Sequence, residues 1–241
     1  MHFSNTIRAI IFDLDGTLRV NRPAINETFY RFAEELGLSS SRRQQRKAAQ
    51  WAHFYWAQSD TLASDLEALG HDDEGFWANY VKRNLVALGC PEENANTLAP
   101  KMRHKMKNQD FDSCVPADVP NTLQTLKNEG YTVGLVSNRR RPIDEELREL
   151  GLSPFLDFAY VAGEVDVWKP NPQIFDRAIA EAGFSCEQMI YVGDNYYADI
   201  VGAQQAGMVP ILIDPERVFP DATCTIIQSI GEIPGLLTPS I

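Results

Sequence analysis

The order in which apolar and amphipathic segments follow one another constrains the fold of this chain most. A short apolar run at 7–12 is followed by helical patterning from about residue 24 to about residue 110, and strands and helices alternate only after that. Alternation at this spacing predicts a parallel sheet with helices on both faces. We therefore expect one α/β domain made of residues 1–18 and 113–241, with an all-helical domain, residues 19–112, inserted into it.

Both regions divide into elements of ordinary length. In the helical stretch, successive amphipathic segments without an intervening strand predict a small helical bundle. We expect its helices at 26–36 (capped by Asn26), 41–58, 61–69, 74–88 and 91–108. In the alternating region we expect helices at 118–129, from Pro142, at 172–182 and at 198–206, strands at 131–136, 158–162, 189–192 and 209–213, and a last strand or helix within 223–237.

Two aspartates close the first apolar run, in the segment Ile-Phe-Asp13-Leu-Asp15-Gly16-Thr-Leu. Alternate side chains of a strand point to the same face, so Asp13 and Asp15 leave the strand end on one side, and Gly16 allows the backbone to turn. Adjacent buried acids lose hydration and repel each other, and a divalent cation removes that penalty. The alternative, from this segment alone, is an ordinary surface turn.

Polar residues also follow the later strands of the predicted sheet. Ligands of an open parallel sheet collect at the carboxyl ends of its strands. Each of these residues alone has an ordinary explanation, such as a helix cap, a solvated lysine or a turn. Their occurrence at successive strand ends favours a single site. They are Ser137 and Asn138 after the strand at 131–136, Lys169 in the loop after 158–162, and Asp194 after 189–192, with Asp199 five residues later.

As a set, these segments resemble the haloacid dehalogenase-like hydrolase superfamily over nearly the full length of the chain. The resemblance rests on Asp13-Leu-Asp15-Gly16-Thr17-Leu18, Ser137-Asn138, Lys169-Pro170-Asn171-Pro172-x-Ile-Phe175 and Gly193-Asp194-Asn-Tyr-Tyr-Ala-Asp199. The helical insertion resembles the cap of the family's phosphoglycolate phosphatase-like branch. The resemblance implies a Rossmann-like core with an inserted helical cap domain. True dehalogenases generally lack the second aspartate, so Asp15 favours phosphate chemistry.

The resemblance also implies a role for each residue in a Mg²⁺-dependent phosphatase acting on a small phosphorylated metabolite. Asp13 is expected to be the nucleophile and Asp15 the general acid and base. Mg²⁺, which prefers oxygen ligands, is expected on Asp13, the Asp15 carbonyl and Asp194. Whether Asp199 is a further ligand or an anchor stays open. Ser137, the Asn138 backbone and Lys169 are expected to bind the phosphoryl group, and Thr17 either adds a hydroxyl there or serves as a helix cap.

Three arginines, Arg139–Arg141, follow Ser137-Asn138 and precede a predicted helix, where the helix dipole disfavours cations. One interpretation is a solvated loop whose charges are balanced by acids in the first turn of that helix. The other is that Arg139 faces the site and reads a second anionic group of the substrate.

Composition narrows the remaining classes of function. The formal net charge of -11 argues against general binding of nucleic acid. No apolar run has the length of a membrane span. The first residues lack a signal-peptide pattern, so we expect a cytoplasmic enzyme. The 4 cysteines are far apart and indicate neither disulfides nor a zinc site. A phosphomutase and a non-catalytic binding protein remain alternatives, and no oligomeric state is predicted.

Overall fold

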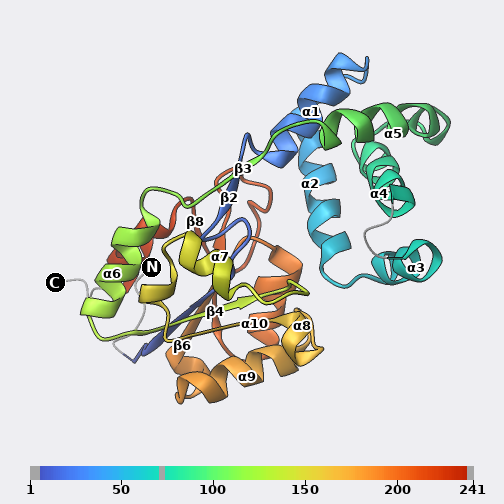
Figure 1. The fold of residues 1–241 in the computed structure, drawn as a ribbon. Helices are drawn as coiled ribbons and strands as arrows, with labels where there is room; N and C mark the ends of the chain where they lie inside the picture. Colours follow the sequence, from blue (N-terminus) through green and yellow to red (C-terminus); the bar gives the residue numbers. More distant parts are fainter. Residues whose placement is uncertain (1–5, 71–73, 238–241) are drawn as a thin grey trace. The chain divides into compact units, whose positions relative to one another are not determined.

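The computed structural model describes residues 6–70 and 74–237, and the chain divides into two compact units (Figure 1). An α/β unit comprises Met1–Val20 and Cys114–Ile241, and a helical unit comprises Asn21–Ser113. Of the ranges expected for the α/β domain, residues 1–5 and 238–241 lie outside the described residues.

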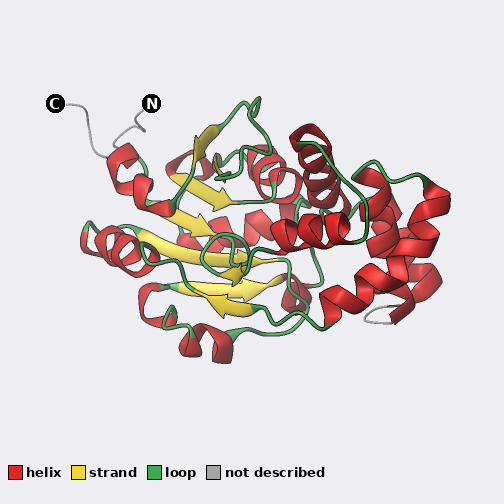
Figure 2. Ribbon diagram, turned by 90° about the horizontal axis from the view of Figure 1, so that it is seen from above, coloured by secondary structure: helices red, strands yellow, loops and turns green. Residues whose placement is uncertain are grey.

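A six-stranded sheet of order β5-β4-β1-β6-β7-β8 organises the α/β unit, and every neighbouring pair is parallel (Figure 2). In the register, Phe12 of β1 lies opposite Leu135 of β4 and Val192 of β6. The predicted α/β fold is confirmed. The strands are β1 (Ala9–Phe12), β4 (Thr132–Ser137), β5 (Phe158–Val161), β6 (Met189–Gly193), β7 (Val209–Ile213) and β8 (Thr225–Ile227).

Strand alternation divides the interior of this unit into two layers. Ile10 and Phe12 of β1 are buried on one face, in a cluster that includes Leu123 of helix α6. Ile11 is buried on the other face, in a cluster that includes Phe175 of helix α9. Helices therefore cover both faces of the sheet, as the apolar strands require. The α-helices of this unit are α6 (Val119–Asn128), α7 (Asp144–Glu149), α8 (Ala162–Val165), α9 (Pro172–Ala182), α10 (Gly202–Gln205) and α11 (Ile233–Leu237).

Several predicted boundaries in this unit differ from the observed ones. The helix expected from Pro142 begins at Asp144, and the last segment contains both a strand and a helix. The helix expected at 198–206 begins earlier, with a π-helical turn, Tyr196–Val201, and the Asn195 side chain caps that turn by accepting hydrogen bonds from two of its backbone N–H groups. Ser137 ends β4 instead of following it.

The helical unit contains the helices that the pattern predicts, within one or two residues at each end. They are α1 (Ile25–Glu35), α2 (Arg42–Trp56), α3 (Asp60–Leu69), α4 (Glu74–Ala87) and α5 (Glu92–Lys107). Asn26 does not cap α1, because the backbone carbonyl of Ala24 already accepts from the Thr28 N–H and closes the first turn. Sequence analysis missed β2 (Val20–Arg22) and β3 (Asp112–Cys114), which pair in a two-stranded sheet.

Aromatic side chains form a compact cluster inside the helical unit. The Tyr55 and Tyr80 ring centroids lie 5.2 Å apart, and those of Trp51 and Tyr80 lie 5.8 Å apart. A polar group is buried with them: the Tyr55 hydroxyl donates to Asp65 Oδ2 at 3.0 Å, and Arg83 Nη2 donates to Asp65 Oδ1 at 2.8 Å. Asp65 therefore satisfies a fully buried hydroxyl.

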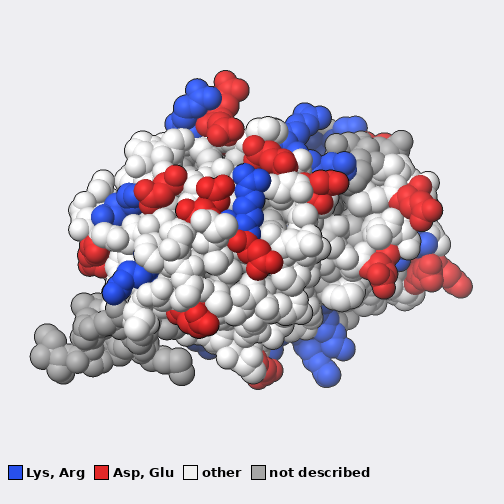
Figure 3. Space-filling view, turned by 90° about the horizontal axis from the view of Figure 1, so that it is seen from below, with Lys and Arg blue, Asp and Glu red and all other residues white. Residues whose placement is uncertain are grey.

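The surface carries charges of both signs. On the face drawn in Figure 3, acidic and basic side chains are interspersed and do not gather into a broad basic area. Within residues 6–70 and 74–237, no helix combines the length and the apolar character needed to span a bilayer.

We expect Asp65→Ala to lower the free energy of unfolding by about 1–3 kcal/mol, because the buried Tyr55 hydroxyl loses its acceptor. Urea unfolding followed by circular dichroism measures the change. Glu67→Ala, at an exposed position of the same helix, is the matched control and is expected to change stability by less than about 0.5 kcal/mol. Equal effects of the two substitutions would show that the Asp65 contacts do not stabilise the unit.

Candidate active site

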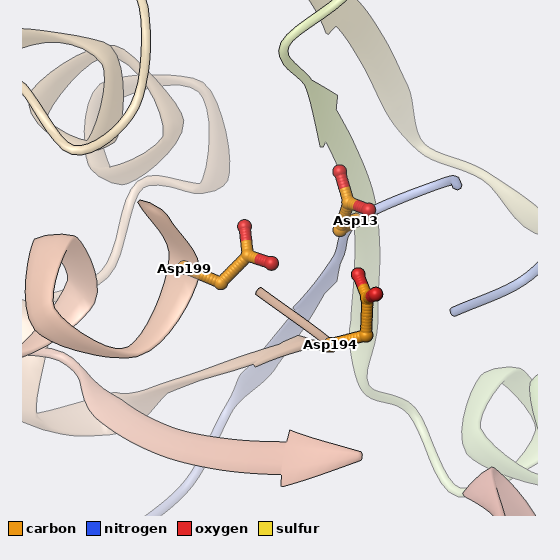
Figure 4. A group of neighbouring side chains, drawn as sticks. All are labelled: Asp13, Asp194 and Asp199. Carbon is orange, nitrogen blue, oxygen red and sulfur yellow. The ribbon is translucent and has the colours of Figure 1, made fainter. Parts of the chain in front are cut away.

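Three aspartates meet at the carboxyl edge of the sheet. Asp13 directly follows β1, Asp194 directly follows β6, and Asp199 lies on the π-helical turn after β6. One carboxylate oxygen from each lies within 4.8 Å of the others. Figure 4 shows the three side chains turned toward one another. The fold thus brings together acids that are up to 186 positions apart, as their places at strand ends predict.

Lys169 is the cation of this cluster, and its side chain is almost fully buried. Its Nζ donates to Asp13 Oδ1 at 2.6 Å and to Asp199 Oδ1 at 2.7 Å. It also lies 3.0 Å from the Tyr191 hydroxyl and 3.2 Å from the Val136 carbonyl oxygen. Sequence analysis missed Tyr191, although a tyrosine inside an apolar strand is itself a signal, because a buried hydroxyl needs a partner.

Asn138 fixes the backbone that carries this lysine. Its Nδ2 donates to the Lys169 carbonyl oxygen at 2.9 Å, and its Oδ1 accepts from the Lys169 N–H at 2.7 Å. The predicted role concerned the Asn138 backbone, whereas the structure shows a further task for the side chain. Ser137, the residue before it, is buried at the end of β4.

Two glycines allow the backbone to approach the acids closely. Gly16 has φ +86°, and a Cβ on it would lie 2.4 Å from Asp194 Oδ2. A Cβ on Gly193 would lie 2.3 Å from Asp199 Oδ2. Asp199 is further held by the backbone N–H of Asn195, which donates to the same Oδ2 at 2.9 Å. Any side chain at either glycine therefore displaces a carboxylate of the cluster.

Burial and mutual repulsion shift two acids of the cluster, Asp13 and Asp194, toward their neutral forms. Burial, reinforced by the charges of Asp199 and Asp15 and opposed by Lys169, raises the pKa of Asp13 to about 7. Burial and the charge of Asp13 hold the pKa of Asp194 well above its usual range. No residue of the described ranges donates a hydrogen bond to the Asp194 side chain or pairs with it.

Lys169, in contrast to these acids, is favoured in its charged form. Burial would lower the pKa of Lys169, but the charges of Asp13 and Asp199 raise it well above its usual range, so it stays protonated. One ammonium thus faces three carboxyl groups. Carboxylate oxygens are the ligands that hard divalent cations prefer, so the donor set and the uncompensated Asp194 fit such a cation.

Asp15 lies outside this cluster and is paired with two arginines. Its Oδ2 accepts from Arg139 Nε at 2.6 Å, and its Oδ1 accepts from Arg139 Nη2 at 2.7 Å and from Arg19 Nη1 at 2.8 Å. Burial would raise the pKa of Asp15, but the hydrogen bonds and charges of Arg139 and Arg19 lower it. Sequence analysis missed Arg19, which gave no signal besides its distance of four residues from Asp15.

The other predicted residues also lie at this edge of the unit. Thr17 is buried, and its hydroxyl has no hydrogen-bond partner among residues 6–70 and 74–237. Arg139 forms a second ion pair with Glu146, in the first turn of α7, whereas Arg140 and Arg141 are exposed. Of the three acids expected to balance the arginine run, Glu146 is thus the one in an ion pair with it, and its partner there is Arg139.

Comparisons with known proteins find relatives of this chain in sequence and in fold. A family model described as haloacid dehalogenase-like hydrolase matches residues 10–213. Haloacid dehalogenase-like hydrolase domain-containing protein 3 of Danio rerio is 27% identical, over 96% of each chain. Ribulose-1,5-bisphosphate 5-phosphatase of Halopiger xanaduensis is 28% identical, over 87% of this chain and 85% of the relative. The crystal structure of 2-haloacid dehalogenase from Pseudomonas syringae is similar with a TM-score of 0.55 and 24% identity, covering 95% of this chain and 97% of that one.

We expect Gly16→Ala to lower the free energy of unfolding by more than the roughly 1 kcal/mol typical of a left-handed alanine, because the new Cβ meets the Asp194 carboxylate. Chemical denaturation measures the loss. Gly130→Ala is the matched control, since Gly130 has φ +85° and open space around its Cβ position. If both variants lose the same stability, the contact with Asp194 contributes nothing.

Proposed function

The chain belongs to the haloacid dehalogenase-like hydrolases, and we propose that it is a Mg²⁺-dependent phosphatase that hydrolyses a small phosphorylated metabolite. The observation that carries this proposal is the pair of carboxylates at the end of β1, with Asp13 inside the acidic cluster and Asp15 beside it. The family resemblance associates the second aspartate with phosphate chemistry. The Halopiger relative, whose name describes a sugar bisphosphate phosphatase, supports the same class.

The residues present fit a magnesium ion. We place it on the Asp13 and Asp194 carboxylates and the Asp15 backbone carbonyl, where it would supply positive charge next to the phosphoryl oxygens. Asp199 is better suited to anchor Lys169, because its Oδ1 accepts from the ammonium and its Oδ2 from the Asn195 N–H.

The protein's own groups then divide the reaction into two steps. Asp13 attacks phosphorus in line and forms an aspartyl-phosphate, while Asp15 gives a proton to the leaving oxygen. Asp15 next takes a proton from the water that attacks the same phosphorus, and Asp13 leaves as the free carboxylate. The buried charge of Lys169 stabilises the negative charge that spreads over the phosphoryl oxygens in both steps.

Three further groups are suited to hold the phosphoryl oxygens. The Thr17 hydroxyl is buried without a described partner, so a substrate oxygen would satisfy it. Ser137 ends the strand next to β1, and the backbone N–H of Asn138 follows it. Such positioning by donors carries most of the catalysis in phosphoryl transfer.

The first test is release of inorganic phosphate from a panel of phosphorylated metabolites, with Mg²⁺ and with EDTA. We expect one or a few compounds to release phosphate, at least about a hundredfold more slowly in EDTA, with recovery on adding Mg²⁺. Retention of phosphate on a sugar, with none released, would identify a phosphomutase. No reaction with any compound, from folded protein in Mg²⁺, would favour a binding protein.

We expect Asp13→Asn to abolish turnover and leave the fold intact, because the amide is not a nucleophile. Phosphate release measures kcat, and circular dichroism checks the fold. Asp176→Asn, at an exposed position of α9, is the matched control and should keep the wild-type rate. An Asp13→Asn variant that keeps more than about 1% of the wild-type rate, a loss under ~2.7 kcal/mol of transition-state stabilisation, contradicts this role.

A further inference from the structure

Asp15 belongs to a group of four charged side chains, the Asp15 cluster, formed with Arg19, Arg139 and Glu146. Arg139 holds both carboxylate oxygens of Asp15, at 2.6 and 2.7 Å, in a two-pronged contact. Its Nη1 donates to Glu146, and Arg19 Nε lies 3.6 Å from the same glutamate. The cluster contains two cations and two anions, so its charges balance.

This balance bears on the role of Arg139. All three nitrogens of its guanidinium donate to carboxylates of the protein itself. A receptor for a second anionic group of the substrate would need positive charge in excess, and with Asp15 ionised the Asp15 cluster offers none. The contacts instead direct the guanidinium at Asp15.

These contacts also bear on stability, because the side chains that make them are partly buried. The Asp15 side chain is 40% exposed, that of Arg139 is 27% exposed and that of Glu146 is 31% exposed. An isolated ion pair of this exposure contributes about 0–1 kcal/mol to folding, and a two-pronged pair within a network of charges is the arrangement that contributes more. A planar guanidinium also provides orientation, because two parallel hydrogen bonds fix the plane of the carboxylate.

We propose that Arg139, itself held by Glu146, is a positioning residue that orients the Asp15 carboxyl group for proton transfer. The inference rests on the proposed phosphatase function. The first step starts from protonated Asp15, which keeps the Arg139 hydrogen bond on its unprotonated oxygen. Its proton moves to the ester oxygen as the bond of that oxygen to phosphorus breaks and the Asp13–phosphorus bond forms. In the second, Asp15 regains a proton from water as the water oxygen bonds to phosphorus and Asp13 leaves. Arg139 takes part in no bond change, and it limits where the Asp15 oxygens lie.

The role predicts a dependence on the leaving group. An alkyl ester leaves as a strongly basic oxygen and needs the proton, whereas 4-nitrophenyl phosphate leaves as a stabilised phenolate and needs it little. Proton transfer by a positioned group contributes about 10²–10⁴-fold to a rate, and displacing such a group by about 1 Å costs up to ~10²-fold. Loss of Arg139 should therefore slow alkyl esters selectively.

The test measures kcat and KM of Arg139→Gln with 4-nitrophenyl phosphate and with the best alkyl ester of the metabolite panel. We expect kcat for the alkyl ester to fall at least about tenfold more than kcat for the aryl ester, with KM changed less than about twofold. Arg140→Gln, which removes the same charge from an exposed neighbour, is the control and should match the wild type.

Equal falls with both esters, a rise in KM with kcat retained, or an effect no larger than that of Arg140→Gln would each overturn the role. A wild-type protein that hydrolyses neither ester contradicts the phosphatase function itself, and removes the premise of this inference with it. The two failures are therefore distinguishable by the wild-type rate alone.

Glu146→Gln provides a second route to the same answer, and one that leaves both arginines in place. We expect it to slow the alkyl ester selectively, by less than Arg139→Gln does, and to add little in the Arg139→Gln background, because its hydrogen bond is to Arg139 and Arg19 Nε is farther away, at 3.6 Å. Additive losses in the double variant would show that Glu146 acts independently and would contradict the proposed chain of contacts.

Discussion

The buried ion pairs of Lys169 are the interaction on which the rest of the site depends. An unpaired charge in this interior would cost several kcal/mol, and so would each carboxylate left without its cation. The ammonium lies within hydrogen-bond distance of Asp13, which follows β1, and of groups from β4, β6 and the π-helical turn. It therefore links the strand ends at which the candidate catalytic residues lie. The Asn138 side chain fixes the position of Lys169 through hydrogen bonds to its backbone N–H and its carbonyl oxygen.

Close backbone approach is the second requirement of this arrangement. Asp194 packs against Gly16 and Asp199 packs against Gly193, at distances that a Cβ would not allow. The two glycines flank the two halves of the acidic cluster, one after β1 and one at the end of β6. Because neither glycine has a side chain, the carboxylates of Asp194 and Asp199 can lie directly against the backbone within the cluster.

The parts of this structure that local pattern determines were predictable, and those set by tertiary contact were not. Strand and helix periodicity predicted the parallel sheet, and the strand ends predicted that Lys169 and several acids lie at one edge of it. The pattern missed β2 and β3, since three residues are too few to show alternation. It could not show that Asn138 binds the Lys169 backbone or that Arg139 pairs with Asp15, because those partners are 31 and 124 positions apart in the chain. The roles of the site residues stay predictions that the experiments above test.

The two aspartates of the first motif show how one residue type acquires two environments within three positions. The Asp13 side chain is 8% exposed and paired with an ammonium within the interior, whereas the Asp15 side chain is 40% exposed and held by arginines. A nucleophile gains from a fixed, water-excluded setting, and a proton carrier must reach both a leaving group and a water molecule. Strand β1 ends at Phe12, so both aspartates lie in the segment that follows it, where they meet different neighbours: Lys169 for Asp13 and Arg139 for Asp15. Exchanging these neighbours would alter the chemistry even if both aspartates stayed in place.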